Sequence, residues 1–361
     1  MWKRSERMIM HGLSEVAGQN AYSVLGLRAI GENAEGVIYC EHPFGYPYDR
    51  NLHIDKTNKK KYPIYIMKLF LFFITALHKY SVFHFHYGHS VLNCIELPLY
   101  HLFHKKIYFE FHGSDLRDME KFCRISDMPF DQSEATSPRL HKRNKKICKY
   151  ADGIIVHDDE LIPYLPTECA PVYVVPLRMN LSRFEPCYPD SDNKIIRIVH
   201  APSKRSIKGT QYVLDAYKTL EKEFDNIELI LVEGKTQQEA LEIYKNADII
   251  VDQLFVGTYG VFAIESMALG KPVITYISDE MKEKLPEELP IISADSKTIE
   301  KALAKLIRDG NLRRQKGIEG RQYVEDYHDN VKIACLLRDV YNGSASPRRG
   351  REAFNSIKRP V

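Results

Sequence analysis

Glu265 is a single carboxylate inside an otherwise apolar segment, VGTYGVFAIESMALGKPVI (256–274). The pattern predicts a loop at GTYG followed by a short helix that ends at Gly270, since glycine is favoured just beyond a helix. The N–H groups at the start of such a helix attract anions such as phosphate. Four residues supply that helix start and are therefore candidates for binding a phosphate-bearing ligand: Tyr259, Gly260, Val261 and Phe262. A carboxylate one turn later can accept hydrogen bonds from ribose hydroxyls, although a surface glutamate that gains a little from the helix dipole is the alternative.

A second polar loop, SKRSIKGT (203–210), follows an apolar run and carries Lys204, Arg205 and Lys208. A helix is predicted to begin near Thr210, and cations beside a helix start repel the helix dipole unless an anion lies between them. A diphosphate would supply that anion through charge-assisted hydrogen bonds. The alternative is a basic loop that is simply solvated.

Histidines and polar residues follow two apolar runs in the first half of the chain. The tetrad HGSD ends the run that begins at residue 106, so His112, Ser114 and Asp115 are candidate site residues. His84 and His86 share one face of another predicted strand. They belong to no HxxxH pattern and have few carboxylates nearby along the chain, so structural burial of His84 is favoured over a zinc site.

Short apolar runs alternate with helical patterns along the whole chain, which predicts parallel strands joined by crossover helices. Two series are separated by the proline-bearing segment 180–194, which we interpret as a linker. The fold class predicted is α/β, with two tandem Rossmann-like, doubly wound parallel-sheet domains and an interdomain cleft. Ligands bind outside the carboxyl ends of such strands, which is where the polar loops fall.

One N-terminal and one C-terminal domain are expected, and the family resemblance described below implies that the first is the acceptor side and the second binds the nucleotide sugar. They cover residues 1–179 and 195–341, with a closing helix that can pack back on the first domain, and the polar tail 342–361 is expected to be partly disordered. The first strand is predicted to end at Met10, so that Gly12 lies in the following loop as a donor-binding candidate. Asp158 or Asp159 is interpreted as a helix N-cap.

Composition limits the partners and the compartment. The 361 residues carry a net charge of only +3, which gives no indication of a nucleic-acid partner. Seven cysteines lack any CxxC spacing, so a reducing cytoplasmic location fits better than a disulfide framework or a zinc site. The N-terminus has no adequate apolar core for a signal peptide.

The segment YPIYIMKLFLFFITAL (62–77) is strongly apolar but too short to span a bilayer. Lys61, Lys68 and Thr75 are seven residues apart, so they form one narrow polar stripe on a helix that is otherwise apolar. A helix buried in the core is the favoured interpretation. Peripheral contact with an anionic membrane, helped by the lysines at 59–61, is the alternative.

Taken together, the loops resemble bacterial family-4 glycosyltransferases of the GT-B fold. The similarity runs from about residue 8 to 341 and is carried by TYGVFAIESMALGKPVI, SIKGT, HGSD, VPLRMNLSRFEP and EGRQYVEDYHDNVKIACLLRDVY. The resemblance implies retaining transfer of a sugar from a nucleoside diphosphate sugar to a hydroxyl of a glycan or lipid-linked acceptor, in cell-surface glycan synthesis. It implies Lys208 at the diphosphate, Glu265 as the second motif glutamate and His112 near the donor sugar, with no metal required.

The chain departs from the family at Gly257, where the first motif glutamate is expected. Asp252 and Gln253 are the nearest polar candidates for the donor sugar, and strand alternation predicts that only one of them reaches inward. The departure leaves two alternatives open: a catalytically silent homologue that serves as a binding or scaffold subunit, and a GT-B sugar-nucleotide 2-epimerase.

Overall fold

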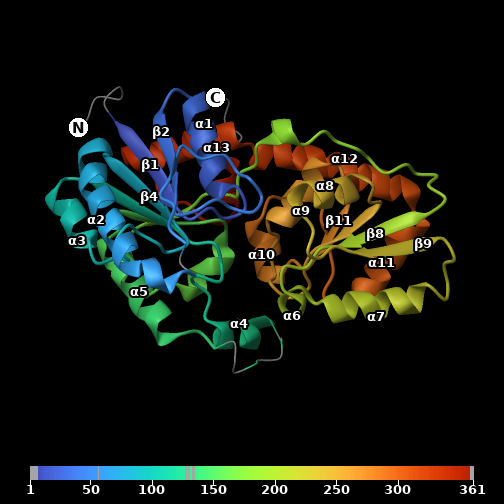
Figure 1. Cartoon of the computed structure of the whole chain (residues 1–361). Coiled ribbons are helices and arrows are strands. Elements are labelled where there is room, and N and C mark those ends of the chain that lie inside the picture. Colours follow the sequence, from blue (N-terminus) through green and yellow to red (C-terminus); the bar gives the residue numbers. More distant parts are fainter. Residues whose placement is uncertain (1–6, 56, 127, 129–130, 132–134, 358–361) are drawn as a thin grey trace. The chain divides into compact units, whose positions relative to one another are not determined.

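The computed structural model describes residues 7–55, 57–126, 128, 131 and 135–357. The chain forms two compact units (Figure 1). Unit 1 contains residues 7–122, 135–178 and 330–357, and unit 2 is built mainly from residues 179–329. The chain therefore leaves unit 1 after Arg178 and returns to it at Asn330.

Unit 1 is built on a seven-stranded sheet in the order β3-β2-β1-β4-β5-β6-β7. Every neighbouring pair is parallel, so all carboxyl ends lie at one edge of the sheet. The strands are β1 (Met8–Leu13), β2 (Asn33–Ile38), β3 (Arg50–Asn51), β4 (Val82–His86), β5 (Lys106–Glu110), β6 (Gly153–Val156) and β7 (Val172–Val174).

Crossover helices connect these strands. They are α1 (Gln19–Ala29), α2 (Tyr62–Lys79), α3 (Leu97–Leu102), α4 (Met119–Ser126) and α5 (Pro138–Tyr150), and α13 (Asn330–Asn342) and α14 (Gly350–Asn355) follow the return of the chain. The predicted N-cap is confirmed at Asp158, whose carboxylate accepts the N–H of Glu160 at the start of a 3₁₀ turn, Asp159–Tyr164.

Helix α13 packs directly against α1. A Cβ at Gly26 would lie 2.2 Å from the carbonyl oxygen of Asn330, so only glycine allows this approach. Ile333 and Leu337 then join Ile9 and Leu27 in one buried cluster. The last long helix is thus part of the core of unit 1.

Unit 2 contains a five-stranded parallel sheet in the order β12-β11-β10-β8-β9. Its strands are β8 (Ile196–His200), β9 (Ile227–Leu231), β10 (Ile249–Val251), β11 (Val273–Thr275) and β12 (Ile292–Ser293). Its helices are α6 (Arg205–Lys208), α7 (Thr210–Leu220), α8 (Gln237–Lys245), α9 (Val261–Ala268), α10 (Asp279–Lys284), α11 (Ile299–Arg308) and α12 (Gly310–Tyr327).

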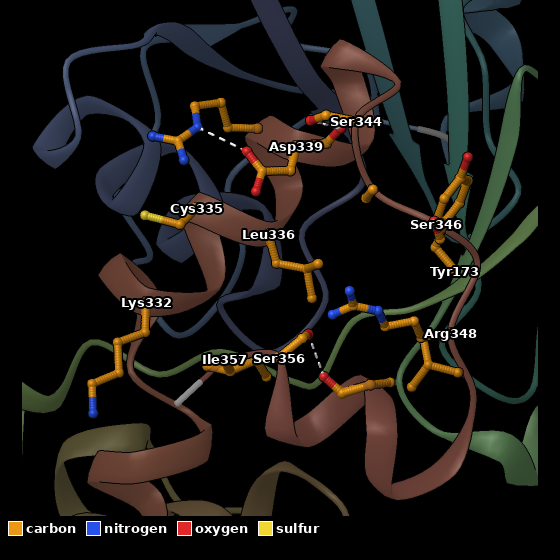
Figure 2. Close-up of a pocket in the computed structure, with 14 residues that line it drawn as sticks. Tyr173, Lys332, Cys335, Leu336, Asp339, Ser344, Ser346, Arg348, Ser356 and Ile357 are labelled. Carbon is orange, nitrogen blue, oxygen red and sulfur yellow. Dashed lines mark hydrogen bonds and ion pairs between the residues drawn. The ribbon is translucent and has the colours of Figure 1, made fainter. Parts of the chain in front are cut away.

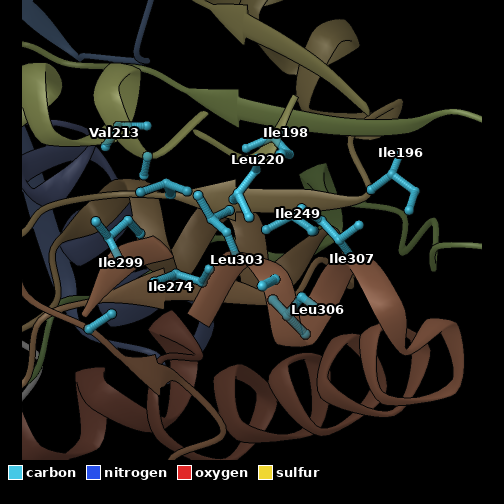
Figure 3. Packing of buried hydrophobic residues seen from close by; sticks show 14 of the residues in the cluster. Ile196, Ile198, Val213, Leu220, Ile249, Ile274, Ile299, Leu303, Leu306 and Ile307 are labelled. Carbon is cyan, nitrogen blue, oxygen red and sulfur yellow. The ribbon is translucent and has the colours of Figure 1, made fainter. Parts of the chain in front are cut away.

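The core of unit 2 lies between its sheet and helices α7 and α11. Figure 3 shows Ile198 and Ile249 from the sheet directed toward Leu303 of α11, and all three are fully buried. Removing such a side chain, as in Leu303→Ala, leaves a cavity that costs about 2–5 kcal/mol of unfolding free energy. This packing fixes the strand ends from which the site loops begin.

The tail differs in part from the predicted disorder. Ala353, Phe354 and Ile357 are buried, because α14 directs a small apolar face into unit 1. The tail and α13 enclose a cavity of about 320 Å³ (Figure 2), and Lys332, Asp339 and several tail residues line it. No predicted site residue lines this cavity. Residues 358–361 lie outside the described part of the chain.

Helix α2 is not the buried core helix that the sequence favours. Only Tyr65, Phe72, Phe73 and Ala76 are buried. Seven large apolar side chains are between 41% and 64% exposed: Tyr62, Ile64, Ile66, Met67, Phe70, Leu71 and Ile74. The narrow packed face occupies one side of the helix, so the rest of its apolar surface remains uncovered by the described residues. None of the described helices is long and apolar enough to cross a membrane.

Candidate active site

Lys208 occupies the carboxyl-end edge of the unit 2 sheet, where α6 follows β8. Its Nζ lies 2.5 Å from Asp252 Oδ1 and 2.9 Å from Gln253 Oε1. Asp252 and Gln253 thus both contact the lysine, and the prediction that only one of them reaches inward is wrong. Strand β10 ends at Val251, so the alternation of a strand does not extend to these two residues.

Gln253 also fixes the loop that precedes α9. Its Nε2 donates to the carbonyl oxygen of Thr258 at 2.6 Å. Gly257 in the same loop has φ of 80°, a conformation that favours glycine. A Cβ there would lie 3.2 Å from the Cβ of Ser278. The backbone at this position therefore disfavours the glutamate that the family motif would place there.

His200, which sequence reasoning did not identify, ties three elements together. Its Nδ1 donates to the carbonyl of Val251, and its Nε2 accepts from the Thr210 hydroxyl, both at 2.9 Å. Gly209 has φ of 73° and packs against Leu254, which allows α7 to begin immediately after Lys208. The only available signal was a histidine at the end of a predicted strand.

The other two predicted cations do not share the partners of Lys208. Arg205 forms a two-bond ion pair with Glu233 at 2.8 and 2.5 Å, and both side chains are largely exposed. Lys204 is also exposed. Because exposed ion pairs contribute little to stability, an anionic ligand can compete for the Arg205 guanidinium.

At the start of α9, backbone N–H groups rather than side chains are available to bind a ligand. Gly260 precedes the helix, and the first N–H groups of a helix have no acceptor within it. The Tyr259 side chain is buried, with its hydroxyl 2.9 Å from that of Tyr323 and 3.1 Å from His328 Nε2. The Phe262 ring packs against Tyr244, with Val261 beside it at the partly exposed helix start. Tyr259 is therefore placed to contact a ligand through its backbone.

Glu265 lies one turn into α9 and is partly exposed. Burial raises its pKa to about 7, and the nearby Arg183 guanidinium opposes that rise. The carboxyl group consequently exchanges its proton near neutral pH. In either form it can hydrogen-bond a vicinal diol.

In unit 1, the HGSD turn is held together from within. Asp115 is buried, and its Oδ1 accepts the backbone N–H groups of His112 and Gly113, both at 2.9 Å. Burial raises the pKa of Asp115 to about 6. Ser114 is exposed and hydrogen-bonds the Tyr87 hydroxyl at 2.7 Å. Of the two predicted acceptor-side residues, only Ser114 is exposed.

Gly12 lies in β1 and not in the following loop, because the strand extends to Leu13. It is buried, and a Cβ there would lie 2.7 Å from the carbonyl oxygen of Val37 on β2. The close approach of the two strands is sufficient to explain a glycine at this position. The prediction that Gly12 lies in a donor-binding loop is wrong.

His112 belongs to a buried polar network that the sequence did not reveal. Arg178 is fully buried and places Nη2 2.6 and 2.5 Å from the two oxygens of Glu110. Burial alone would raise the pKa of Glu110, but Arg178 and the surrounding histidines lower it well below its usual range. His86 Nδ1 lies 3.2 Å from His112 Nε2, and His157 Nε2 lies 3.0 Å from His112 Nδ1.

No protein-family model and no curated protein sequence matches the chain. Solved structures do match it. Sucrose-phosphate synthase from Thermosynechococcus elongatus has a TM-score of 0.65 at 18% identity, covering 93% of this chain and 99% of that one. Anabaena HepE, solved with UDP and glucose, has a TM-score of 0.62 at 10% identity, with 93% and 99% covered.

A glycosyltransferase from Rickettsia africae gives a TM-score of 0.62 at 11% identity, covering 94% of this chain and 98% of that one. At sequence identities this low, the structural similarity is evidence for the fold alone. Together with the two parallel sheets, it confirms the predicted fold class, two Rossmann-like α/β domains of the GT-B type.

Proposed function

We propose that the chain is a retaining glycosyltransferase that moves a sugar from a nucleoside diphosphate sugar to the hydroxyl of a glycan or lipid-linked acceptor. The observation that carries the proposal is Lys208, held by Asp252 and Gln253 at the carboxyl edge of the unit 2 sheet. The family resemblance of the loops adds the bacterial family-4 assignment and a role in cell-surface glycan synthesis. HepE, whose structure contains UDP and glucose, provides a precedent for the ligand on this fold.

In the proposed reaction, the anomeric carbon gains a bond to the acceptor oxygen on the face from which the diphosphate leaves. The diphosphate takes the bonding electron pair, and the proton of the acceptor hydroxyl passes to an oxygen of the departing diphosphate on the same face. Lys208, Arg205 and the N–H groups at the start of α9 stabilise the departing charge, so this step requires no metal. Glu265 accepts hydrogen bonds from the ribose, and His112 approaches the donor sugar.

Removing the Lys208 charge tests donor binding. Lys208→Gln keeps a hydrogen-bond donor for the buried Asp252 while it removes the cation, and we expect nucleoside diphosphates to bind more weakly by roughly 1–3 kcal/mol. Nucleoside monophosphates should lose less, so the gap between the two ligands narrows. Calorimetry across the common nucleobases measures this, with Lys218→Ala on the exposed side of α7 as the control. Equal affinity of diphosphate and monophosphate for the unmodified protein would contradict the assignment.

We also propose peripheral attachment to the inner face of a membrane through α2, in an otherwise cytoplasmic protein. The exposed apolar face of α2 borders a groove of about 840 Å³ lined by Tyr62, Met67, Phe70, Ile95 and neighbouring apolar side chains. The exposed turn Lys59–Lys61 precedes the helix. Apolar surface beside a lysine cluster matches an anionic bilayer.

A catalytically silent homologue is the second candidate function. The positive φ of Gly257 and its contact with Ser278 support it, since together they exclude the first motif glutamate. The two candidates share nucleotide binding and differ only in turnover.

A further inference from the structure

Five histidines gather around Glu110 at the carboxyl edge of the unit 1 sheet. We call His11, His84, His86, His112, His157 and Glu110 the histidine cluster. Strand register produces it: His11 pairs with His84, and His86 pairs with Glu110, so their side chains share one face. His11, His84, His86 and Glu110 are fully buried, whereas His112 and His157 are partly exposed.

Three atoms of the cluster are spaced like the ligands of one metal ion. His86 Nδ1 lies 3.2 Å from His112 Nε2 and 3.6 Å from Glu110 Oε2, and ligand atoms of all three residues fall within 4.8 Å of one another. Adjacent ligands of a tetrahedral zinc ion lie about 3.3–3.6 Å apart. A second possible trio contains His84 and His86, but their rings stack at 4.6 Å with planes 4° apart, so their lone pairs run parallel and do not converge.

The proton positions on His84, His11 and His86 follow from the contact between His84 and Glu110. His84 Nε2 lies 3.0 Å from Glu110 Oε2 without meeting the geometry of a hydrogen bond, and the adjacent carboxylate favours a proton on that nitrogen. His84 Nδ1 then accepts from the Tyr341 hydroxyl at 2.6 Å, and that hydroxyl accepts from His11 Nε2 at 3.0 Å. His11 Nδ1 must therefore accept from His86 Nε2 at 3.1 Å. His86 Nδ1 is left with a lone pair directed at His112.

The contacts of His157 determine the proton position on His112 in the same way. His157 Nδ1 is buried without a hydrogen-bond partner among the described residues and lies 3.4 Å from Glu110 Oε1, which favours a proton on that nitrogen. His157 Nε2 then accepts from His112 Nδ1 at 3.0 Å. His112 Nε2 is therefore also left with a lone pair. With these tautomers, two lone pairs face each other across 3.2 Å beside a carboxylate, an arrangement that favours a cation.

We propose that the histidine cluster binds one divalent transition-metal ion through His86 Nδ1, His112 Nε2 and Glu110 Oε2. Two imidazoles and one carboxylate form a donor set suited to Zn²⁺. Each ligand already has the partner that orients metal ligands in proteins: His11 for His86, His157 for His112 and Arg178 for Glu110. Partly exposed His112 gives the ion access. The site lies within unit 1 and shares His112 with the proposed transfer reaction, and metal titration measures it without turnover.

A proton shared by His86 and His112 is the competing cation. The two nitrogens lie 3.2 Å apart and could share one proton, whereas a metal ion would bind both imidazoles in their neutral form together with the carboxylate.

Metal titration of the purified full-length protein tests the proposal. We expect calorimetry to show one high-affinity Zn²⁺ site, and Co²⁺ to give the intense visible absorption of four-coordinate geometry. His112→Ala should lower the affinity at least about tenfold, because it removes one ligand. It should also abolish any rise in Tm on addition of Zn²⁺. His78→Ala, at an exposed histidine on α2, should change neither result.

The results of these measurements distinguish a bound metal ion from a proton shared by His86 and His112. Absence of Zn²⁺ and Co²⁺ binding, or unchanged binding in folded His112→Ala, overturns the proposal. Nitrogen NMR of labelled histidines gives a second measurement without a variant: a doubly protonated His112 that persists in excess Zn²⁺ would establish the proton instead. Loss of that signal on addition of Zn²⁺, or its absence together with a shift of His86 and His112, supports the metal.

Discussion

Lys208 and Glu265 are the two ionisable side chains that define the candidate donor site, and their surroundings differ. Lys208 forms an ion pair with the buried carboxylate of Asp252, which holds the ammonium group in one position. Burial raises the pKa of Glu265 to about 7, and the charge of Arg183 only partly opposes that rise. Lys208 is therefore suited to binding an anion, and Glu265 to forming hydrogen bonds with hydroxyl groups.

Glu265 should make stability depend on pH. The unfolded carboxyl titrates near 4.5, and the folded one near 7, so between these values the folded state holds more protons and stability falls as pH rises. Glu265→Gln removes this effect. We expect the variant to gain roughly 1–2 kcal/mol of unfolding free energy over the natural protein between pH 5 and pH 8.

Urea unfolding at several pH values measures this gain. Glu300→Gln, at an exposed position on α11, is the control and should show no such trend. A stability difference between Glu265→Gln and the natural protein that stays constant with pH would show that Glu265 is ordinarily solvated.

At the scale of elements, the loop between β10 and α9 sets the site geometry. Gly257→Ala should cost about 1–2 kcal/mol of unfolding free energy, because an L-residue is strained at φ of 80°. Gly234→Ala is a matched control, since it has φ of 64° and open space around its Cβ. Contact with Ser278 should make the Gly257 variant the less stable of the two. Equal stabilities would mean that the loop relaxes freely around position 257.

Helix α2 provides the second element-level prediction. Anionic liposomes should sediment the protein at low salt and release part of it at high salt, because screening weakens the lysine contribution. Phe70→Glu should abolish sedimentation, since it puts a charge on the exposed apolar face. Ile318→Glu, at an exposed apolar residue of α12, is the control. Failure to sediment at any salt concentration would leave the surface of α2 without a membrane role.

At the scale of the whole molecule, the sequence did not predict the short helix α6 around Lys208, but it was sufficient for the parallel sheets and for the helix start at Thr210. These features depend on local periodicity and on residues close together along the chain. Asp252 and Gln253 both contact Lys208 because β10 ends at Val251, directly before them. The apolar run in the sequence does not show where that strand ends. The exposure of α2 was missed because an apolar pattern does not show which side is covered.

The histidine cluster was beyond prediction for a different reason. His11, His86 and Glu110 come from three strands and His157 directly follows a fourth, β6, so they meet only through sheet register. Arg178 and Tyr341 complete the network from still farther along the chain. A single sequence contains no signal for contacts at such separations.

The most direct measurement of the central claim is turnover of a broad panel of nucleotide sugars, with and without glycan and lipid-linked acceptors. We expect release of nucleoside diphosphate from at least one donor, transfer with retained anomeric configuration by NMR, and loss of both in Lys208→Gln. Nucleotide binding without any release or transfer by the folded protein would contradict the account and favour the silent homologue. A donor epimerised at C2 would establish the epimerase instead.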